Sequence, residues 1–217
     1  MHTAEKRVEI HEEKFACFRA RIGHDKVKYK DEYGNEDSHC EPFSKEKDIG
    51  APPPEKARGG RVNPRGISVL YLSNNIETAI SEVRPWLNQN VTIGIFILKS
   101  GLKIINTTND KMILGHFLKD RPLTPDEKAT YVWGSINNSF SKPVRPGDED
   151  IEYIPTQYLA EFFKTNGYDG VAYKSALTKT LTKNGLNNGL NMVLFNHKNA
   201  TLKEKKHLVK AVKIQDF

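Results

Sequence analysis

The sequence predicts a single α+β domain with mixed, mostly antiparallel sheets and flanking helices. Three observations support this fold class. The 217 residues are enough to bury one sizeable hydrophobic core. The ten Phe, eight Tyr and two Trp are too many aromatic residues for a disordered chain. Strand-like and helix-like segments follow one another without the regular alternation of a Rossmann sheet, and the sequence contains neither a G-x-G-x-x-G nor a Walker motif.

The chain is mildly basic. Its 33 Lys and Arg against 27 Asp and Glu leave a formal net charge of +6. Much of the excess lies in the C-terminal segment 197–217, and acidic residues are interspersed through the rest of the chain. A solvated surface explains this distribution better than a continuous binding stripe does, so direct nucleic-acid binding is not expected.

Hydropathy favours a soluble, cytoplasmic protein, and the cysteines and histidines do not favour a disulfide framework or a metal site. The longest apolar run, Val91 to Leu98, is much shorter than the ~20 residues of a membrane helix. Residues 1–14 are charged throughout and lack the apolar stretch of a secretory signal. Cys17 and Cys40 are too few for a disulfide framework, and no two further zinc ligands accompany the adjacent pair His39 and Cys40. Neither a membrane segment nor a metal is therefore expected.

The first elements are expected to be a strand, a long connector and a second strand. Residues from Lys14 to Ile22 alternate in polarity, as in a strand. The polar segment from His24 to Pro54 carries a turn signal at Tyr33-Gly34-Asn35 and ends in three prolines, which exclude a helix, so a surface connector is expected there. A turn-rich loop from Gly59 to Gly66 then leads into a strand from Ile67 to Leu72.

A helix and two strands are expected next. The helix should begin near Asn74 or Asn75, either of which can cap its free N–H groups, and it should end before Pro85. Its apolar positions at helical spacing are Ile76, Ala79, Ile80 and Val83. The two strands should cover Val91 to Leu98 and Leu102 to Ile105.

Two longer helices are expected in the second half of the chain. Thr124-Pro125-Asp126-Glu127 supplies a capping Thr, a Pro at the first helical position and a Glu three residues after the cap, so a helix should run from there to about Asn138. Another should run from Thr156 to Asn166, and Gly167 suits the left-handed position that ends it. The apolar face of that helix is expected to comprise Tyr158, Leu159, Phe162 and Phe163.

The remaining elements are expected to be strands. Apolar runs predict strands from Gly170 to Ser175, from Asn191 to Phe195 and from Leu208 to Ile214. The segment from Ala176 to Leu190 is rich in Gly and Asn and is expected to be a loop between the first two of them.

The strongest candidates for a functional site lie between Gly59 and Arg84. Two glycines before Arg61 let the backbone bend closely and leave its guanidinium, which suits a pyrophosphate or a carboxylate, at the mouth of a turn. Tyr71 lies near the end of an aliphatic strand, and Glu82 lies on the helix that follows. Together these side chains could hold an anionic ligand, stack on a ring and orient a hydroxyl. The alternative is that Arg61 and Glu82 form a structural ion pair and that Tyr71 belongs to the core.

Three segments of this region resemble the RES domain family, which is named for its Arg, Glu and Ser residues. They are Arg61-Val62-Asn63-Pro64-Arg65-Gly66, Leu70-Tyr71-Leu72 and Thr78-Ala79-Ile80-Ser81-Glu82-Val83. Ten positions separate Arg61 from Tyr71 and eleven separate Tyr71 from Glu82, as in the family. Further segments that resemble strands of the family are Phe18-Arg19-Ala20, Gly167-Tyr168-Asp169-Gly170-Val171-Ala172-Tyr173-Lys174-Ser175 and Asn191-Met192-Val193-Leu194-Phe195. The resemblance covers most of residues 15–196.

The resemblance implies a fold related to ADP-ribosyltransferases and an enzyme that consumes NAD as a substrate, with no resident cofactor. Many members of the family are toxins of bacterial toxin–antitoxin pairs. They cleave the bond between nicotinamide and ribose by hydrolysis or phosphorolysis, and a minority transfer ADP-ribose to a protein. The active site carried over by position comprises Arg61, Tyr71, Glu82, Ser175 and Asn191, with Arg19 as a further candidate for substrate binding.

These residue types suit that chemistry. Departure of nicotinamide leaves positive charge on the ribose carbon, in a state similar to that of glycoside cleavage. The Glu82 carboxylate would stabilise this charge and orient a hydroxyl or the nucleophile. Arg61 would hold the pyrophosphate, and Tyr71 would stack on nicotinamide. Ser175 and Asn191 would donate hydrogen bonds to nicotinamide or ribose. Without the resemblance, Ser175 would be taken as the end of a strand and Asn191 as a loop cap.

The chain is longer than the compact toxins of the family. We expect one domain over residues 1–217, with an N-terminal arm at 1–14, insertions at 101–150 and 176–190, and a basic segment at 197–217. Arg19 either supports the pocket or pairs with a surface acid, whereas Asn63 and Gly66 are expected to shape the turn.

The implied partners are NAD, phosphate and an antitoxin protein. Water and phosphate both stay open as the acceptor, because both approach the same ribose carbon. The alternatives to NAD cleavage are ADP-ribosyl transfer to a macromolecule and a non-enzymatic module that binds nucleic acid or a protein partner.

Overall fold

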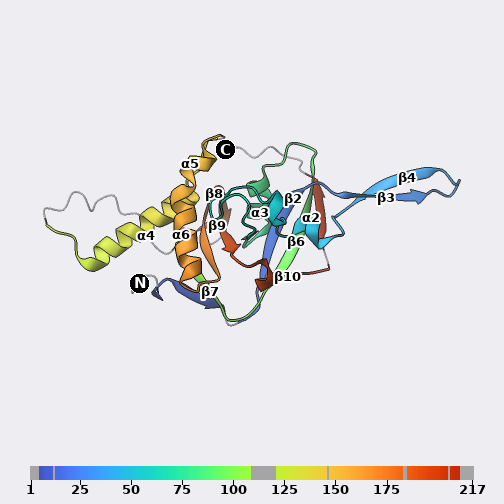
Figure 1. Cartoon of the computed structure of the whole chain (residues 1–217). Helices are drawn as coiled ribbons and strands as arrows, with labels where there is room; N and C mark the ends of the chain where they lie inside the picture. The colour runs from blue at the N-terminus through green and yellow to red at the C-terminus, as the bar shows by residue number, and fades with distance from the viewer. Residues whose placement is uncertain are drawn as a thin grey trace.

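The protein is an α+β domain built around one large sheet, as predicted (Figure 1). The computed structural model describes residues 5–11, 13–108, 121–145, 147–182, 185–204 and 206–210. The sheet within these residues consists of β1 (Val8–His11), β2 (Ala16–Ile22), β5 (Leu70–Ser73), β6 (Asn90–Leu98), β7 (Leu102–Asn106), β8 (Gly170–Thr182), β9 (Gly185–Leu194), β10 (Ala200–Leu202) and β11 (His207–Lys210). Its order is β1-β7-β8-β9-β5-β2-β6-β10, with β11 also paired to β6. The β7–β8 pair is parallel and the other pairs are antiparallel, so the prediction of a mixed, mostly antiparallel sheet is confirmed.

Within the residues that the structure describes, three longer helices flank the sheet. They are α3 (Ile76–Val83), α4 (Pro125–Ser141) and α6 (Ile154–Thr165). The short helical segments are α2 (Glu46–Ile49), η1 (Pro54–Lys56), α5 (Glu149–Glu152) and η3 (His197–Asn199). α3 packs against β2, β5 and β8, whereas α4 and α6 pack against β8 and against each other. None of the helices in the part of the chain described is long and apolar enough to cross a bilayer.

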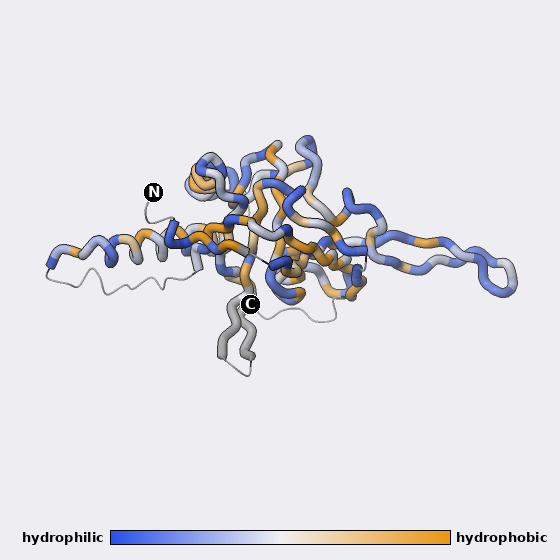
Figure 2. Tube along the Cα trace, turned by 90° about the horizontal axis from the view of Figure 1, so that it is seen from below, coloured by the Kyte–Doolittle hydropathy of each residue, from blue (hydrophilic) through white to orange (hydrophobic). Residues whose placement is uncertain are grey.

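Both faces of the sheet are buried. Ile105, Val171 and Val193 belong to one core cluster, together with Trp133, Phe140 and Phe163 of α4 and α6. The next residue in β8 and in β9, Ala172 and Leu194, belongs to a second cluster on the opposite face. Successive side chains of a strand point to opposite faces, so a sheet buried on both sides needs consecutive apolar residues. This explains why several strands read as apolar runs, and Figure 2 shows that hydrophobic residues concentrate in the middle of the molecule.

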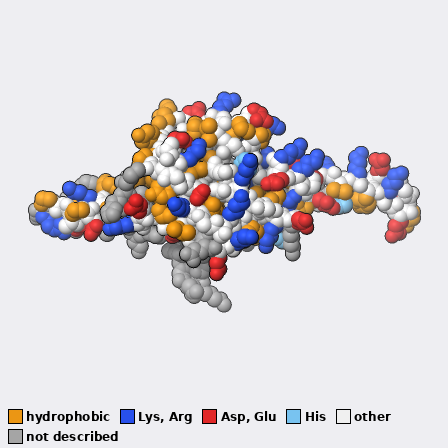
Figure 3. Space-filling model, turned by 60° about the horizontal axis from the view of Figure 1, so that its bottom comes forward, with side chains coloured by type: hydrophobic (Ala, Val, Ile, Leu, Met, Phe, Trp, Pro, Cys, Tyr) orange, Lys and Arg blue, Asp and Glu red, His pale blue; other side chains and the backbone are white. Residues whose placement is uncertain are grey.

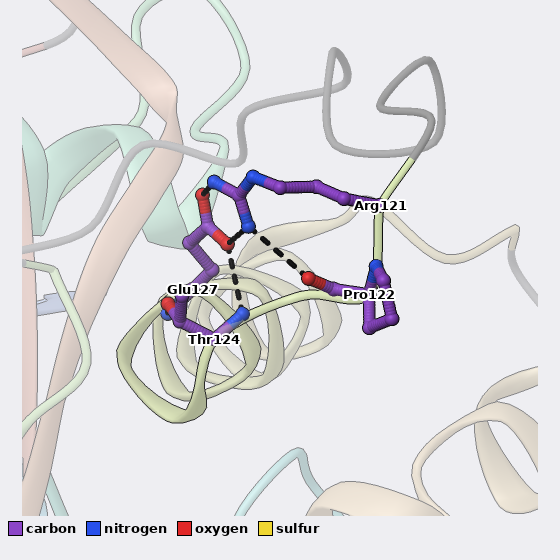
Figure 4. A network of polar contacts seen from close by, with 4 residues as sticks. All are labelled: Arg121, Pro122, Thr124 and Glu127. Atoms are coloured by element: carbon purple, nitrogen blue, oxygen red, sulfur yellow. Dashed lines mark hydrogen bonds and ion pairs between the residues drawn. The ribbon is translucent and has the colours of Figure 1, made fainter.

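Local signals placed two helix starts correctly. The Asn75 side chain accepts a hydrogen bond from the Thr78 backbone N–H at 2.7 Å, so Asn75 caps α3. Thr124 and Glu127 form a capping box at the start of α4, with the Thr124 N–H donating to Glu127 Oε2 at 2.9 Å. Arg121 adds two hydrogen bonds to the same carboxylate, each 2.9 Å long (Figure 4). Both starts are local arrangements, which is why the sequence alone could indicate them.

The expected connector from His24 to Pro54 is wrong over most of its length. It contains the antiparallel hairpin of β3 (Asp25–Lys30) and β4 (Glu36–Glu41), which projects from the body of the protein (Figure 1). The expected turn lies at its tip, where Gly34 has a φ of 82°. Lysines alternate with Val27 and Tyr29 along β3, and this period of two was the signal for a strand. Most of the hairpin is exposed, and Figure 3 shows charged side chains of both signs along it.

The expected loop from Ala176 to Leu190 is also wrong. β8 continues to Thr182 and β9 begins at Gly185, and the two pair with a register shift between Lys174 and Lys179. Pairing between strands thus overrides the loop composition of this segment. The segment 1–14 contributes β1, which pairs with β7.

The prediction for the apolar face of α6 was partly wrong, and the predicted C-terminal strand is only partly covered by the described residues. The buried side of α6 is formed by Thr156, Ala160 and Phe163, while Tyr158 is 75% and Phe162 42% exposed. The outer stripe of this helix is therefore apolar, and the predicted apolar face was partly wrong. β11 covers the expected strand from Leu208 as far as Lys210, and residues 211–217 lie outside the described part of the chain. Residues 1–4 of the arm and residues 109–120 of the segment 101–150 also lie outside it.

Candidate functional site

A cavity of about 470 Å³ brings most of the predicted site residues together. Its wall is formed by β2, the loop before β5, β5, α3, the segment of α5 and α6, β8 and β9. Five of the six predicted residues line it: Arg19, Arg61, Tyr71, Glu82 and Asn191. Ser175 does not line the cavity but is bonded to Glu82.

Two hydrogen bonds from side chains of the sheet hold the Glu82 carboxylate in place. Ser175 Oγ donates to Glu82 Oε1 at 2.8 Å, and Asn191 Nδ2 donates to the same oxygen at 2.6 Å. The three residues come from α3, β8 and β9, so the sheet and the helix together fix the carboxylate. Within the described residues, no hydrogen bond reaches Oε2. One carboxylate oxygen is thus anchored and the other is available to a ligand.

Asn191 is itself oriented by a residue that sequence reasoning missed. Ser73 Oγ donates to Asn191 Oδ1 at 3.0 Å, and the two residues are register partners in the β5–β9 pair. With Oδ1 accepting from Ser73, the Nδ2 group is directed to Glu82. Ser73 ends the strand that carries Tyr71, but only the cross-strand register reveals its role.

Arg61 presents an unsatisfied cation to the cavity. Its guanidinium lies over the Tyr153 ring at 5.2 Å from the ring centroid. Its Nη1 is buried without a hydrogen-bond partner among the described residues. A buried guanidinium donor without a partner is suited to an anionic ligand. Arg61 and Glu82 do not pair with each other in the part of the chain described, so the alternative of a structural ion pair between them is not supported.

The loop that carries Arg61 is fixed by close contacts. Gln157 Nε2 donates to the carbonyl oxygens of Gly60 and Asn63 at 2.9 and 3.2 Å. A Cβ atom on Gly60 would lie 2.5 Å from Tyr71 Oη, so glycine is required for this approach. The Asn63 amide donates to three backbone carbonyls, which confirms that this residue shapes the turn.

Tyr71 has a structural hydroxyl and a ring at the cavity wall. Its hydroxyl donates to Asn63 Oδ1 at 2.8 Å and accepts from the Val62 N–H at 3.1 Å. Burial raises the pKa of the Tyr71 phenol well above its usual value, so the group is neutral at physiological pH. The ring also packs against the core cluster of α4 and α6. The Tyr71 side chain is therefore part of both the hydrophobic core and the cavity wall.

Arg19 supports the cavity from β2. Its Nη1 donates to the Tyr71 carbonyl oxygen at 2.8 Å, and its Nε is buried without a partner in the described structure. Burial, and secondarily the charge of Arg21, lowers the pKa of Arg19 to about 10. The guanidinium remains charged at neutral pH, and of the two roles considered for Arg19 the structure favours support of the pocket.

The residues that the sequence did not single out lie outside the recognised segments. Tyr153 and Gln157 follow a long stretch without motifs and reach the cavity only because α6 packs on the sheet. Glu149 also lines the cavity. A search of the described residues finds no group of three or more His, Cys, Asp or Glu side chains arranged to hold a metal ion.

Comparison with known families identifies the chain. The model of the RES domain matches residues 32–215. The chain belongs to the RES domain family. The matched segment of this RES domain protein contains Arg61, Tyr71, Glu82, Ser175 and Asn191, whereas Arg19 precedes it. The resemblance drawn from the spacing of the first three residues is thus confirmed.

No curated protein matches the sequence of this RES domain protein significantly. Among solved structures, it is similar to a chain in the crystal structure of the M. tuberculosis MbcT–MbcA toxin–antitoxin complex. That alignment has 13% sequence identity and a TM-score of 0.46, and it covers 96% of this chain and 90% of the other.

Proposed function

We propose that this RES domain protein cleaves the nicotinamide–ribose bond of NAD by hydrolysis or phosphorolysis. The observation that carries the proposal is the Glu82 carboxylate, anchored through one oxygen by Ser175 and Asn191 at the wall of a cavity that also contains the unpaired Arg61 donor. The cavity volume of about 470 Å³ lies in the range of sites for small-molecule ligands.

The arrangement suits a reaction in which positive charge develops on ribose. The bond between nicotinamide N1 and ribose C1′ breaks, its electron pair goes to N1, and nicotinamide leaves as a neutral molecule. Glu82 stabilises the positive charge at C1′ and, when water is the acceptor, takes the proton that water loses as its oxygen bonds to C1′. Arg61 binds the diphosphate, and the Tyr71 ring bounds the nicotinamide. A carboxylate fixed before the reaction needs no reorganisation as the charge develops.

We also propose that the protein is the toxin of a bacterial toxin–antitoxin pair. The membership in the RES family supports this role, because many members are such toxins. Induced expression in a bacterial host should stop growth and deplete NAD, and the Glu82→Gln variant should do neither. Growth arrest by both forms would separate toxicity from NAD cleavage.

The decisive experiment follows nicotinamide release from NAD by purified protein, with and without phosphate. We expect release by the wild type and a loss of about 10²- to 10⁴-fold in Glu82→Gln, the range typical of a lost acid–base group. Glu77→Gln is the matched control, because Glu77 is an exposed acid on the same helix. ADP-ribose as the second product indicates water as acceptor, and its 1″-phosphate indicates phosphate. Label from NAD on a protein in a lysate would instead indicate ADP-ribosyl transfer, and intact NAD in every reaction would refute the proposal.

A further inference from the structure

A second cavity adjoins the first and is lined by four cations. Its volume is about 250 Å³, and it shares Arg19 and Tyr71 with the first cavity. The other cations at its wall are Arg21 on β2 and Lys56 and Arg58 on the segment before β5. Its remaining lining residues are Pro52, Asn63, Ile67 and Val69, with no acidic side chain among those described.

The two cavities differ sharply in charge. Among the described residues, the first is lined by Arg19 and Arg61 and by two acids, Glu82 and Glu149, so these charges cancel. The second carries +4 from Arg19 and the three further cations. Three of the four cations, Arg21, Lys56 and Arg58, are exposed to solvent, and a hollow lined by charges of one sign attracts an ion of the opposite sign. This difference in charge suits the two cavities to different parts of one ligand.

The cations of the second cavity have few protein partners. Arg19 Nε is buried without a hydrogen-bond partner in the described structure. Within the same residues, no ion pair involves Arg21, Lys56 or Arg58. The polar groups of Asn63 and Tyr71 at the wall are already bonded to each other and to the loop. Among the side chains described there, those free to bind a ligand are thus cationic donors.

The reacting carbon does not belong in this second cavity. Glu82, Ser175 and Asn191 do not line it, and its volume of about 250 Å³ is smaller than a typical site for a whole small-molecule ligand. A free phosphate held there would not be positioned as the acceptor next to Glu82. The site therefore fits a charged group on the part of the substrate remote from nicotinamide.

We propose that the second cavity binds the 2′-phosphate of a phosphorylated nicotinamide dinucleotide, so that the enzyme cleaves NADP in preference to NAD. This inference rests on the proposed cleavage reaction. A phosphomonoester carries close to two negative charges at pH 7 and three acceptor oxygens, and Arg side chains are the usual partners of a 2′-phosphate. The diphosphate common to both dinucleotides would remain with Arg61 in the first cavity.

The activity test uses the double variant Lys56→Gln and Arg58→Gln. Both residues are exposed, so neither substitution removes core packing. The ratio of kcat/KM for NADP to that for NAD should exceed about tenfold in the wild type and approach one in the double variant, since each substitution removes a charged hydrogen-bond donor. Lys99→Gln is the matched control, an exposed cation at the turn after β6, and should keep the wild-type ratio. An equal loss of both activities would overturn the assignment, because it would place the cations on a group that both dinucleotides share.

A binding test is independent of any cleavage. Calorimetric titration compares 2′-AMP with 5′-AMP, which have the same composition and differ only in the position of the phosphate. The double variant should bind 2′-AMP about 100-fold more weakly than the wild type does and should lose less than about threefold for 5′-AMP. Inorganic phosphate, tested alone, should bind much more weakly than 2′-AMP. Equal losses of affinity for the two nucleotides, or phosphate binding as tight as that of 2′-AMP, would overturn the proposal even if neither dinucleotide is cleaved. A selective loss of affinity for 2′-AMP, in a protein that cleaves neither dinucleotide, would support the site and refute only the reaction.

Discussion

Ser175 is expected to act on the reaction through Glu82 instead of touching the substrate. It is 7% exposed and does not line the cavity, and its hydroxyl donates to Glu82 Oε1 at 2.8 Å. The change Ser175→Ala removes this hydrogen bond and leaves the one from Asn191, at 2.6 Å, in place. The carboxylate should then lose part of its fixed orientation while the shape of the cavity stays the same.

The expected magnitude follows from the type of hydrogen bond. A hydrogen bond to a charged group contributes about 1.5 to 3 kcal/mol, and we take the lower end because Glu82 itself is exposed to solvent. A loss of about 1.5 kcal/mol in transition-state stabilisation corresponds to about a tenfold fall in kcat. KM for the dinucleotide should change by less than about twofold, because Ser175 is not part of the cavity wall.

Steady-state nicotinamide release, with kcat and KM determined separately, measures this effect. Ser175→Thr keeps the hydroxyl and should recover most of the lost kcat. Ser139→Ala is the control, because it removes a serine hydroxyl that bonds to a helix carbonyl on α4 at 3.0 Å. A higher KM with unchanged kcat would refute the reasoning, because it would mean that Ser175 binds the substrate directly.

Three other predictions test the site, a helix start and the core. Tyr153→Leu removes the ring under the Arg61 guanidinium, a contact of about 0.5 to 2 kcal/mol, and should raise KM about 2- to 30-fold. Tyr153→Phe keeps the ring and should keep the wild-type KM. An equal rise of KM in both variants would show that the ring does not contribute to binding. Thr124→Ala removes the cap of α4 and should lower the free energy of unfolding by about 1 kcal/mol in urea titration, and an unchanged midpoint would contradict the capping box. Burial raises the pKa of the Cys17 thiol to about 12, so at pH 8 a thiol reagent should label Cys40 alone in the folded protein and both cysteines after unfolding.

Much of the fold was predictable because its signals are local. Asn75 and Thr124 mark helix starts through hydrogen bonds within one turn, and Gly167 takes the left-handed conformation expected after α6, with a φ of 80°. The β3–β4 hairpin was missed although Val27 and Tyr29 alternate with lysines, because its exposed strands lack the apolar runs of most buried strands. The extension of β8 and β9 was missed because pairing between the two strands overrides a composition typical of a loop. The residues that α6 buries could not be predicted either, since both sides of this helix carry apolar residues and only packing on the sheet selects one.

The candidate site was predictable in part for a different reason. Arg61, Tyr71 and Glu82 occur at a spacing typical of the family, and the structure brings all three to one cavity. Ser73 and Tyr153 carry no such pattern. Ser73 reaches the site through strand register and Tyr153 through helix packing, and neither relation produces a pattern in the neighbouring sequence.

The most direct test of the central claim is a crystal structure of the Glu82→Gln variant with NAD bound. We predict that the nicotinamide ribose lies in the larger cavity with C1′ next to the side chain of residue 82, and that the diphosphate contacts Arg61. A dinucleotide bound elsewhere on the protein, or bound in this cavity with its ribose turned away from residue 82, would contradict the account.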